Sequence, residues 1–247
     1  MSLIRELYHR LFWSHCPICG SRFKKYLDGG TDAPVWIELH GVGAGRRPST
    51  CPQCGSSDRE RLVYLYLKDY FLPKQKKEHI KCLHIAPERQ LSFFLSRQTN
   101  IEYNASDKRA EGYYYPDNVQ DIDIMSMPEI PDNTYDLVIC NHVLEHVPND
   151  ITAMKELRRI IKYKGTAILQ VPYALKLQKT IDNPTITTPE ARFKAYGQND
   201  HVRLYGMDYP KRLKEAGFYV DIENITKKYS KKRGLNKDEN IFICHKL

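Results

Sequence analysis

The segment at residues 121–171 constrains the fold more than any other part of the chain. Its turn-forming residues at 131–134 precede the apolar run YDLVIC at 135–140, which is typical of a strand covered on both faces of a sheet. The sequence TAILQV at 166–171 is a second such run, stopped by Pro172. Two buried strands joined by a crossover helix form the parallel unit of an open α/β sheet. We therefore expect an α/β fold.

The residues between these two strands have the pattern of a helix. Asn149 or Asp150 can cap its start, and apolar residues then recur at helical spacing up to residue 161. We expect Gly165 to end this helix in the left-handed conformation. Because ligands bind at the carboxyl ends of parallel strands, Asn141 and His142 are candidate site residues by position alone.

The length of the chain and its apolar pattern limit the class of protein. With 247 residues there is room for one α/β domain and a small additional unit. No apolar run reaches the roughly 18 residues of a membrane-helix candidate. Residues 1–13 mix charged and apolar side chains as a short amphipathic helix does, unlike a signal peptide. We therefore expect a cytoplasmic protein without a membrane partner.

The formal net charge of +8 is concentrated at the two ends of the chain, and one basic run stands out at Lys227–Arg233. Such a run could contact nucleic acid or an anionic substrate. Charge runs usually form solvated surfaces, so we expect this one to be a solvated hairpin between two strands.

The sequence C-P-x-C-G occurs twice, at residues 16–20 and 51–55. Two thiolates separated by two residues on a tight turn can bind one metal ion, and two such turns supply the four sulfurs of a closed, structural zinc site. The expected ligands of this Zn²⁺ ion are Cys16, Cys19, Cys51 and Cys54. A redox-active or disulfide-linked pair is the alternative. The cysteines in apolar runs, which we expect to be buried, are Cys82, Cys140 and Cys244.

The rest of the N-terminal third is expected to surround this zinc ribbon. The glycine-rich stretch Gly41–Arg47 has the composition of a phosphate-binding loop, but no helix can open directly after it, so we expect a flexible loop. Ser57 and Glu60 have the spacing of a capping box, which predicts a helix start, and that helix should end before Pro73.

The charged run Lys74–Glu78 is expected to link two domains, residues 1–78 and residues 79–247. In the second domain, apolar runs predict seven strands, at residues 80–86, 101–106, 119–123, 135–140, 166–171, 217–222 and 240–244. The last two flank the basic run, so we expect them to pair antiparallel at a sheet edge. Pro87 suits the first position of a helix. Asp107 closes the second strand, about 20 residues after the first, a spacing at which a carboxylate can bind ribose hydroxyls.

Several motifs together resemble class I S-adenosylmethionine-dependent methyltransferases. They are D-x-x-x-M-P-x-x-P-D-N-T-Y-D-L-V-I-C-N-H-V-L-E-H-V-P-N-D from Asp123, E-L-R-R-I-I-K-Y-K-G, and A-G-F near the end of the chain. The chain most resembles methyltransferase type 11-like members that have an N-terminal four-cysteine zinc ribbon and L-H-x-A-P-E in place of the glycine-rich motif. This resemblance extends over residues 16–247. It implies a Rossmann-like sheet, S-adenosyl-L-methionine as cofactor, and zinc in the ribbon.

The resemblance also implies roles for residues at the strand ends. The residues that would face the methionine end of the cofactor are His84, Ala86, Pro87 and Glu88. Further contacts are implied with the ribose at Asp107, with the adenine at Asp123 and Ile124, and beside the sulfonium at Asn141 and His142. Pro87 removes an amide donor where the family at large has glycines, and Glu88 could instead pair with the ammonium group of the cofactor.

Methyl transfer from a sulfonium is an in-line displacement, and a hydroxyl or ammonium acceptor also needs a base. His142 and His201 are the candidate bases, each with a structural hydrogen-bonding role as the alternative. Residues 196–206 lie where the family places substrate-binding insertions, and the candidate substrate residues are Tyr196, Gln198, Asp200, Arg203 and Tyr205. Among these, Arg203 could clamp a carboxylate or phosphate. Glu145 and His146 are expected to orient the helix entry or the loop around the cofactor.

The sequence thus favours a methyltransferase acting on an oxygen or nitrogen atom of a small molecule or glycan. A second interpretation is an RNA methyltransferase that grips nucleic acid through the ribbon and the basic ends, although no stripe of interleaved aromatic and basic residues supports it. A third is a zinc-ribbon binding module with an inactive methyltransferase-like fold. An NAD-dependent dehydrogenase would need G-x-G-x-x-G after the first strand, and this motif is absent there.

Overall fold

The computed structural model describes residues 13–75, 79–109, 116 and 118–247. Seven strands form the central sheet, in the order β12-β13-β10-β9-β6-β7-β8. Their bounds are β6 (Ile80–Ile85), β7 (Ile101–Asp107), β8 (Val119–Asp121), β9 (Tyr135–Asn141), β10 (Ile161–Gln170), β12 (Tyr219–Glu223) and β13 (Ile241–His245). β13 runs antiparallel to both neighbours, while the other pairs are parallel. The predicted seven strands and antiparallel last pair are confirmed.

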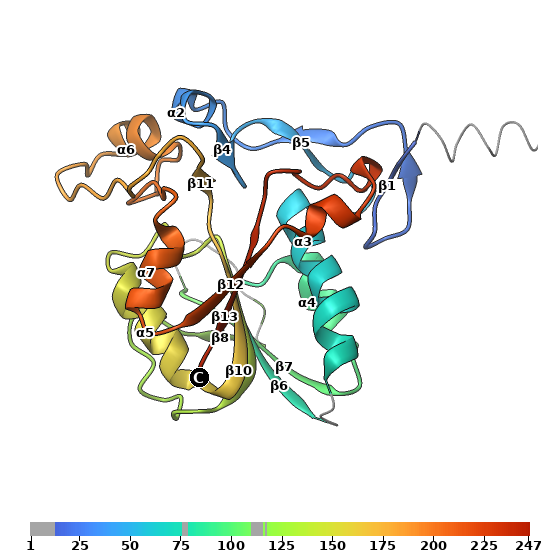
Figure 1. Ribbon diagram of the computed structural model, residues 1–247, viewed down its shortest axis with the longest axis vertical. Coiled ribbons are helices and arrows are strands. Elements are labelled where there is room, and N and C mark those ends of the chain that lie inside the picture. The colour runs from blue at the N-terminus through green and yellow to red at the C-terminus, as the bar shows by residue number, and fades with distance from the viewer. Residues whose placement is uncertain (1–12, 76–78, 110–115, 117) are drawn as a thin grey trace, which may run out of the picture.

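Helices cover both faces of this sheet (Figure 1), as in a Rossmann-like α/β fold. One face carries α3 (Asp58–Tyr66), which continues through turns at Leu67–Phe71 and Leu72–Lys74, and α4 (Arg89–Leu95). The other carries α5 (Asp150–Ile160) and α7 (Tyr209–Glu215). Strand β9 alternates between two hydrophobic cores, because Leu137 and Ile139 pack on the α3 side and Val138 and Cys140 on the α5 side.

The chain order of the strands creates a switch point at the centre of the sheet. From β6 the chain moves outward through β7 and β8, and it then returns to add β9 on the other side of β6. The loops after β6 and β9 therefore leave in opposite directions, which opens a crevice at the carboxyl ends of these two strands. Ala86 and His142, the residues that follow β6 and β9, lie at this crevice.

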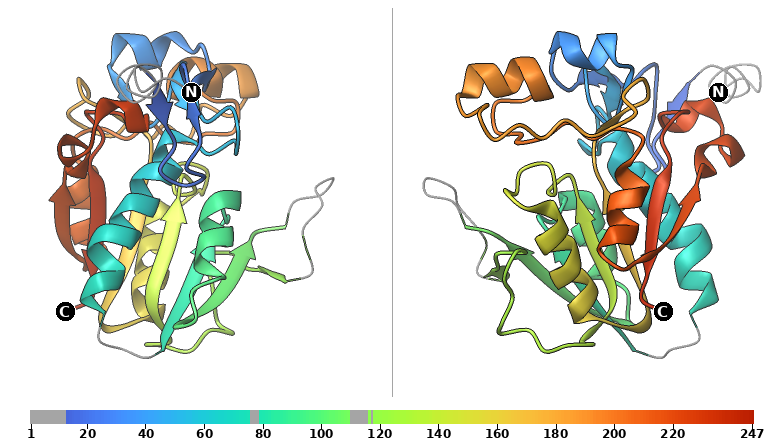
Figure 2. Two further views of the ribbon diagram at one scale, coloured as in Figure 1. Left: turned by 90° about the vertical axis from the view of Figure 1, so that its right-hand side faces the viewer. Right: turned by 60° about the vertical axis from the view of Figure 1, so that its left-hand side comes forward.

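Two segments from distant parts of the sequence lie over the carboxyl ends of the strands (Figure 2). We name them together the cap. Its first segment, residues 27–50, contains β3 (Leu27–Gly29), α2 (Pro34–Glu38), β4 (Gly41–Val42) and β5 (Arg47–Thr50). Its second segment, residues 173–206, contains β11 (Tyr173–Ala174) and α6 (Pro189–Tyr196). β4 pairs antiparallel with β11, so backbone hydrogen bonds join the two segments.

Trp36 holds the two halves of the cap together. Its ring is buried with Tyr196 and Leu204, and its Nε1 donates a hydrogen bond to the Gly197 carbonyl (3.4 Å). Helix α6 ends at Gly197 in the left-handed conformation, with φ 84°. A Cβ atom at this position would overlap the Trp36 ring, so the close approach of the two segments requires glycine here.

The end of helix α5 differs from the prediction. The Asn149 side chain caps its start by accepting a hydrogen bond from the Thr152 amide (3.0 Å). The helix ends at Ile160, and β10 begins at the next residue, so Gly165 lies inside the strand and does not end the helix. Lys164 takes the left-handed conformation instead, with φ 61°. The predicted helix was therefore too long, because the apolar pattern of residues 160 and 161 suits a strand start as well as a helix end.

The basic run connects the predicted antiparallel pair β12 and β13, and none of residues 227–233 is buried, but the connection is not a tight hairpin turn. Two short 3₁₀ turns, Ile225–Lys228 and Lys231–Arg233, connect β12 and β13. The buried guanidinium of Arg61 donates hydrogen bonds to the carbonyls of Arg233 (3.1 Å) and Gly234 (2.7 Å). The run is thereby held against the start of α3. The stretch Gly41–Arg47 is not a plain loop either, since it contains β4 and the first residue of β5.

Other local predictions are confirmed. Ser57 and Glu60 form the capping box of α3, with each side chain bonded to the amide of the other residue. The three cysteines predicted to be buried in strands are buried: Cys82, Cys140 and Cys244. The predicted helix at residues 1–13 lies almost entirely outside the described residues, as do residues 76–78 of the predicted linker. In the part of the chain that the structure describes, no helix has the length and apolar character needed to cross a membrane.

Candidate functional site

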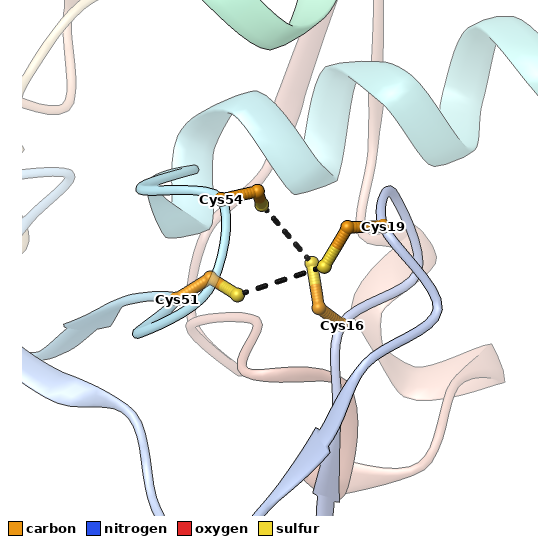
Figure 3. A group of neighbouring side chains, drawn as sticks. All are labelled: Cys16, Cys19, Cys51 and Cys54. Carbon is orange, nitrogen blue, oxygen red and sulfur yellow. Dashed lines mark hydrogen bonds between the residues drawn. The ribbon is translucent and has the colours of Figure 1, made fainter.

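The two C-P-x-C-G copies fold into matching turns. The first lies between β1 (Ser14–His15) and β2 (Arg22–Phe23), and the second directly precedes α3. In each turn the glycine has a positive φ, 73° at Gly20 and 76° at Gly55, and its amide donates to the carbonyl of the first cysteine. Figure 3 shows that the two turns face each other and that their four sulfurs converge.

The four sulfurs fit one tetrahedral metal ion. All lie within 4.8 Å of one another, with 3.8 Å between Cys16 Sγ and Cys54 Sγ and 3.9 Å between Cys19 Sγ and Cys51 Sγ. Sulfurs bound at about 2.3 Å to a tetrahedral zinc ion are about 3.8 Å apart. A disulfide needs sulfurs about 2.05 Å apart, so a disulfide-linked pair does not fit this geometry.

A cavity of about 260 Å³ opens at the switch point of the sheet, and we name it the cofactor-side cavity. The residues predicted to bind the cofactor that line it are Ala86, Asp107, Asp123, Ile124 and His142. Much of the remaining wall is apolar, with side chains that include Ile85, Ile122, Met125 and Val143. Asp107 ends β7, and burial raises the pKa of its carboxyl group. A flat apolar group and a hydroxyl-bearing group could thus bind side by side here.

Asp123 is held in place by two hydrogen bonds. Its Oδ2 accepts from Lys108 Nζ (2.7 Å), and its Oδ1 accepts from the Met125 amide (2.9 Å). Burial raises the pKa of this carboxyl group, but the two hydrogen bonds and the charge of Lys108 together outweigh burial and lower the pKa. Asp123 is therefore an oriented anion in the wall of the cofactor-side cavity.

Ala86 and His142 both have the left-handed backbone conformation, with φ 46° and 54°. Residues other than glycine rarely adopt it, and such strain concentrates at binding and active sites. The Ala86 amide donates to the Ser106 carbonyl (2.8 Å), and the His142 amide donates to the Gln170 carbonyl (2.7 Å). Neighbouring strands therefore hold both residues in this conformation.

The other residues predicted to bind the cofactor do not line this cavity. His84 is buried, and its ring nitrogens pair with Tyr103 Oη (3.0 Å) and Glu88 Oε2 (2.8 Å). Glu88 also accepts from Asn141 Nδ2 (3.2 Å). These contacts engage Glu88 within the protein. Pro87 is not in the first helical position, because α4 begins two residues after it.

A second cavity of about 310 Å³ adjoins the first, because His142 and His146 line both. We name it the cap-side cavity, since the cap, the start of α3 and the turn after β9 enclose it. Its wall contains the glycine-rich residues 43–45 of the cap and several polar or charged side chains, which are Arg47, Asp58, Arg59, Glu145, Gln198 and His201. This lining suits a polar ligand.

Three titratable side chains meet in the cap-side cavity. Their ligand atoms lie within 4.8 Å of one another, and the residues are Glu145, His146 and His201. Burial raises the pKa of Glu145 to about 8 and lowers the pKa of His201 to about 4. Burial also lowers the pKa of His142 and His146. The imidazoles are therefore neutral at pH 7, the form that can accept a proton or bind a metal ion.

Glu145 and His146 are expected from the sequence to orient the helix entry or the loop around the cofactor, whereas the structure places both in the wall of the cap-side cavity. A signal for their role was present in the spacing, because Glu145 and His146 follow His142 by three and four residues. Residues at these spacings on a helical turn face the same side. The turn at residues 142–146 brings all three to one place, although it does not continue as a helix.

Three of the five residues predicted to bind substrate are part of the interior. Arg203 is buried and donates to the carbonyls of Leu144, Val147 and Pro148. The Tyr205 hydroxyl pairs with Asp150 Oδ2 (2.8 Å), and the Tyr196 hydroxyl donates to the Asn183 carbonyl (3.1 Å). A substrate-clamping role does not fit the burial and pairing of these three side chains. Arg203 and Tyr205 instead form hydrogen bonds with the turn after β9.

The remaining two predicted substrate residues do lie at the site. Gln198 lines the cap-side cavity, and its Nε2 donates to Asp200 Oδ1 (2.9 Å). Asp200 Oδ2 in turn lies 3.2 Å from His146 Nδ1. Asp200 therefore orients the His146 ring, and Gln198 orients Asp200.

Buried polar atoms without a hydrogen-bond partner gather around the two cavities. Among the described residues those in the cavity walls are Arg59 Nε, His142 Nε2 and Glu145 Oε2, and Asn141 Oδ1 belongs to the residue before His142. Buried polar groups are normally paired, since an unpaired one costs about 1–3 kcal/mol. Such atoms in the wall of a cavity are placed to bind a ligand.

Residues 90–169 match a family model described as a methyltransferase domain. The match supports a class I methyltransferase. It runs from α4 into β10 and contains Asp107, Asp123 and the turn after β9. The matched residues thus supply most of the cofactor-side cavity, while the cap lies outside them.

Comparisons with individual proteins gave further similarities. An uncharacterised protein of Methanocaldococcus jannaschii is 52% identical over 48 residues, which are 19% of this chain and 20% of that protein. The match therefore spans about a fifth of the length of this relative. The structure of an S-adenosylmethionine-dependent methyltransferase from Archaeoglobus fulgidus is 20% identical, with 77% of this chain and 95% of that chain covered and a TM-score of 0.47. The YcgJ protein of Bacillus subtilis is 14% identical, with 76% and 99% covered and a TM-score of 0.48.

Proposed function

We propose that this protein is an S-adenosylmethionine-dependent methyltransferase that methylates an oxygen or nitrogen atom of a small polar molecule or a glycan. The observation that carries the proposal is the pair of adjoining cavities at the switch point, which share His142 and His146. In-line displacement requires the methyl donor and the acceptor to meet in one line, and a shared wall provides such a meeting point. The methyltransferase-domain match supports the assignment of the cofactor-side cavity.

The cofactor, when bound, supplies a methyl group on a positively charged sulfonium. In this proposal Asp107 binds the ribose hydroxyls, because a carboxylate accepts two hydrogen bonds without rearrangement. Asp123 and Ile124 hold the adenine, and the apolar wall beside them excludes water from it. The left-handed turn at Ala86 lets the loop after β6 approach the cofactor, in the role that glycine has elsewhere in the family.

The acceptor binds in the cap-side cavity, and its volume and polarity favour a small polar group. Arg59 Nε is buried without a hydrogen bond and lies 4.0 Å from Glu88 Oε1. Arg47 is already paired with Asp58 through two hydrogen bonds (2.6 and 2.8 Å). A hydroxyl-bearing or weakly anionic acceptor could accept the missing hydrogen bond from Arg59 Nε. A volume of about 310 Å³ beneath the cap suits a small molecule or one sugar unit.

His142 and His201 are the candidate bases of the reaction. His142 lines both cavities, and its Nε2 is buried without a hydrogen-bond partner. His201 donates from Nδ1 to the Tyr196 carbonyl (3.2 Å), which leaves Nε2 with its lone pair. Either nitrogen could take the acceptor proton, and His201 faces only the cap-side cavity.

We also propose that the four cysteines bind one structural Zn²⁺ ion. Four thiolate ligands fill a tetrahedral ion and leave no position for a substrate. Cys54 lies three residues before Ser57, and residues 57–59 line the cap-side cavity. Zinc would therefore fix the position of one wall of the acceptor site.

Calorimetric titration of the full chain with S-adenosylmethionine and with its demethylated product tests the proposal. We expect micromolar binding to the wild type and to His201→Ala. We expect His201→Ala to lose methyl transfer to a panel of hydroxyl and amine acceptors, measured with a labelled methyl group. Absence of binding to the wild type would refute the proposal and favour a binding module without activity. Loss of cofactor affinity in His201→Ala would contradict its place on the acceptor side.

A further inference from the structure

We propose that Glu145, His146 and His201 form a second metal site, which takes a divalent transition-metal ion in the cap-side cavity. The three ligand atoms lie within 4.8 Å of one another, in a wall lined by both the cap and the turn after β9. This site is separate from the four cysteines. The binding of the ion does not depend on the proposed function, and only its chemical role rests on that function.

Both histidines are oriented as metal ligands are. His146 Nδ1 lies 3.2 Å from Asp200 Oδ2, and His201 Nδ1 donates to the Tyr196 carbonyl (3.2 Å). Metal-binding imidazoles almost always donate their other N–H to a carboxylate or a backbone carbonyl, because this bond fixes the tautomer and the ring orientation. In both rings the lone pair is thereby left on Nε2. The two rings meet edge to face, with centroids 4.7 Å apart.

Glu145 supplies a carboxylate that has no adequate partner in the protein. Its side chain is 1% exposed, and Oε2 makes no hydrogen bond with the described residues. Oε1 lies 3.9 Å from His146 Nε2 and 3.5 Å from His142 Nδ1, at or beyond the limit of a hydrogen bond. A buried carboxylate without partners is costly. A cation between Glu145 and the two Nε2 atoms would provide the missing partner.

Modest side-chain movements would let these residues hold such an ion. Ligands bound at about 2.1 Å to a tetrahedral ion are about 3.4 Å apart, so the 3.9 Å separation of Glu145 and His146 must close by about 0.5 Å. No separation among the three exceeds 4.8 Å, so none must close by more than about 1.4 Å. His146 can make this movement, because its side chain is 30% exposed and lines both cavities. Three protein ligands leave a fourth position open towards the cavity, which is the arrangement of catalytic sites.

The donor atoms select the kind of ion. Two imidazoles and one carboxylate suit Zn²⁺, Mn²⁺, Fe²⁺ or Co²⁺, whereas four thiolates select zinc. In the proposed methyltransferase, an acceptor hydroxyl bound to the ion would lose its proton more readily, as metal-bound water does. Because His201 Nε2 would be bound to the ion, the proton would pass to His142 Nε2 and then to solvent. The acceptor oxygen would form a bond to the methyl carbon as the carbon–sulfur bond breaks, and the bonding electron pair would stay on sulfur in a neutral thioether.

Titration of the full chain with Mn²⁺ tests this site, since the four thiolates do not favour that ion. Chain loaded with zinc at its cysteines is titrated, and free Mn²⁺ is followed by electron paramagnetic resonance. We expect about one Mn²⁺ per chain and at least a tenfold loss of affinity in Glu145→Gln and in His201→Gln. Asp200→Asn should weaken Mn²⁺ binding about tenfold. Because the Asp200 side chain is exposed, this substitution should not disturb folding.

His79→Gln is the matched control, because His79 pairs with Glu102 (2.9 Å) on the surface and away from both cavities. Its Mn²⁺ affinity should equal that of the wild type. The proposal is overturned by a wild type that binds no Mn²⁺ or Zn²⁺ beyond the cysteine-bound ion, or by equal affinity in Glu145→Gln and His201→Gln. Calorimetry with S-adenosylmethionine on the same samples separates the two proposals. If Glu145→Gln and His201→Gln abolish Mn²⁺ binding, the metal site is supported, whether or not the wild type binds the cofactor.

Discussion

Replacing Asp107 by asparagine tests the cofactor-side cavity with a minimal change of shape. Asp107 ends β7 and lines that cavity. Asparagine keeps one carbonyl oxygen, but it loses the negative charge and turns the second acceptor into a donor. If Asp107 accepts hydrogen bonds from two ribose hydroxyls, the variant can keep one of these hydrogen bonds, now to a neutral oxygen, and must lose the other.

The size of the effect follows from these two bonds. A hydrogen bond to a charged group contributes about 1.5–3 kcal/mol. Losing one such bond and weakening the other should cost about 3 kcal/mol of binding free energy, which is roughly a hundredfold in Kd. Stability should change in the opposite direction. Burial raises the pKa of Asp107, so its charge destabilises the folded state at pH 7, and the neutral asparagine should slightly raise the free energy of unfolding.

Calorimetry with S-adenosylmethionine and thermal unfolding without ligand measure these two effects. Asp121→Asn is the control, because Asp121 ends the neighbouring strand β8, does not line the cavity, and accepts a hydrogen bond from the Arg109 amide (3.0 Å). It should leave the cofactor Kd unchanged. An unchanged Kd in Asp107→Asn, or an equal loss in both variants, would refute the ribose-binding role.

Two further predictions concern the support of the site. Asp150→Asn removes the partner of Arg212 (2.6 Å) and Arg203 (3.8 Å), so urea unfolding at pH 7 should show a loss of about 3–5 kcal/mol. Burial opposes the ionisation of Asp150, but the two arginines lower its pKa. The loss of stability in the variant should therefore be complete above about pH 4 and shrink as the pH falls further. A loss of stability that does not depend on pH would contradict the pairing. For the four-cysteine site, a strong chelator should make about four thiols per chain reactive towards a chromogenic disulfide while the three strand cysteines stay protected. Four reactive thiols before chelation would exclude a bound metal.

The sheet and the cofactor-side cavity could be predicted because their signals are local. The apolar run at 135–140 does form a strand that is buried throughout, and the capping box at Ser57 forms as its spacing indicates. The rule that ligands bind at the carboxyl ends of strands indicates His142, and the spacing after the first strand indicates Asp107. Asp123 is indicated by the resemblance to methyltransferases. All three line the cofactor-side cavity, whereas Asn141, indicated by the same rule as His142, does not.

The cap-side cavity could be predicted only in part. Gln198 and His201 line it, as expected of substrate-side residues, but the wall formed by the first segment of the cap depends on contacts between distant residues. Nothing in the residues around Trp36 indicates that they pack against a segment that ends at Gly197. Arg203 shows the same limit, since a polar run in the sequence suggests an exposed surface. In the folded chain the carbonyls at residues 144, 147 and 148 need donors, and the buried guanidinium provides them.

The two cavities take their residues from different parts of the chain, and this division has a consequence for function. The cofactor-side cavity is lined by residues between 85 and 148, most of them inside the match at 90–169. The cap-side cavity takes most of its lining from residues 29–59 and 172–201, outside the match. In the proposed function, the family match therefore bears on the cofactor, and the choice of acceptor depends on the cap. The turn at residues 142–146 contributes to both cavities. Substitutions in the cap should change acceptor preference alone, whereas substitutions in this turn should affect both ligands.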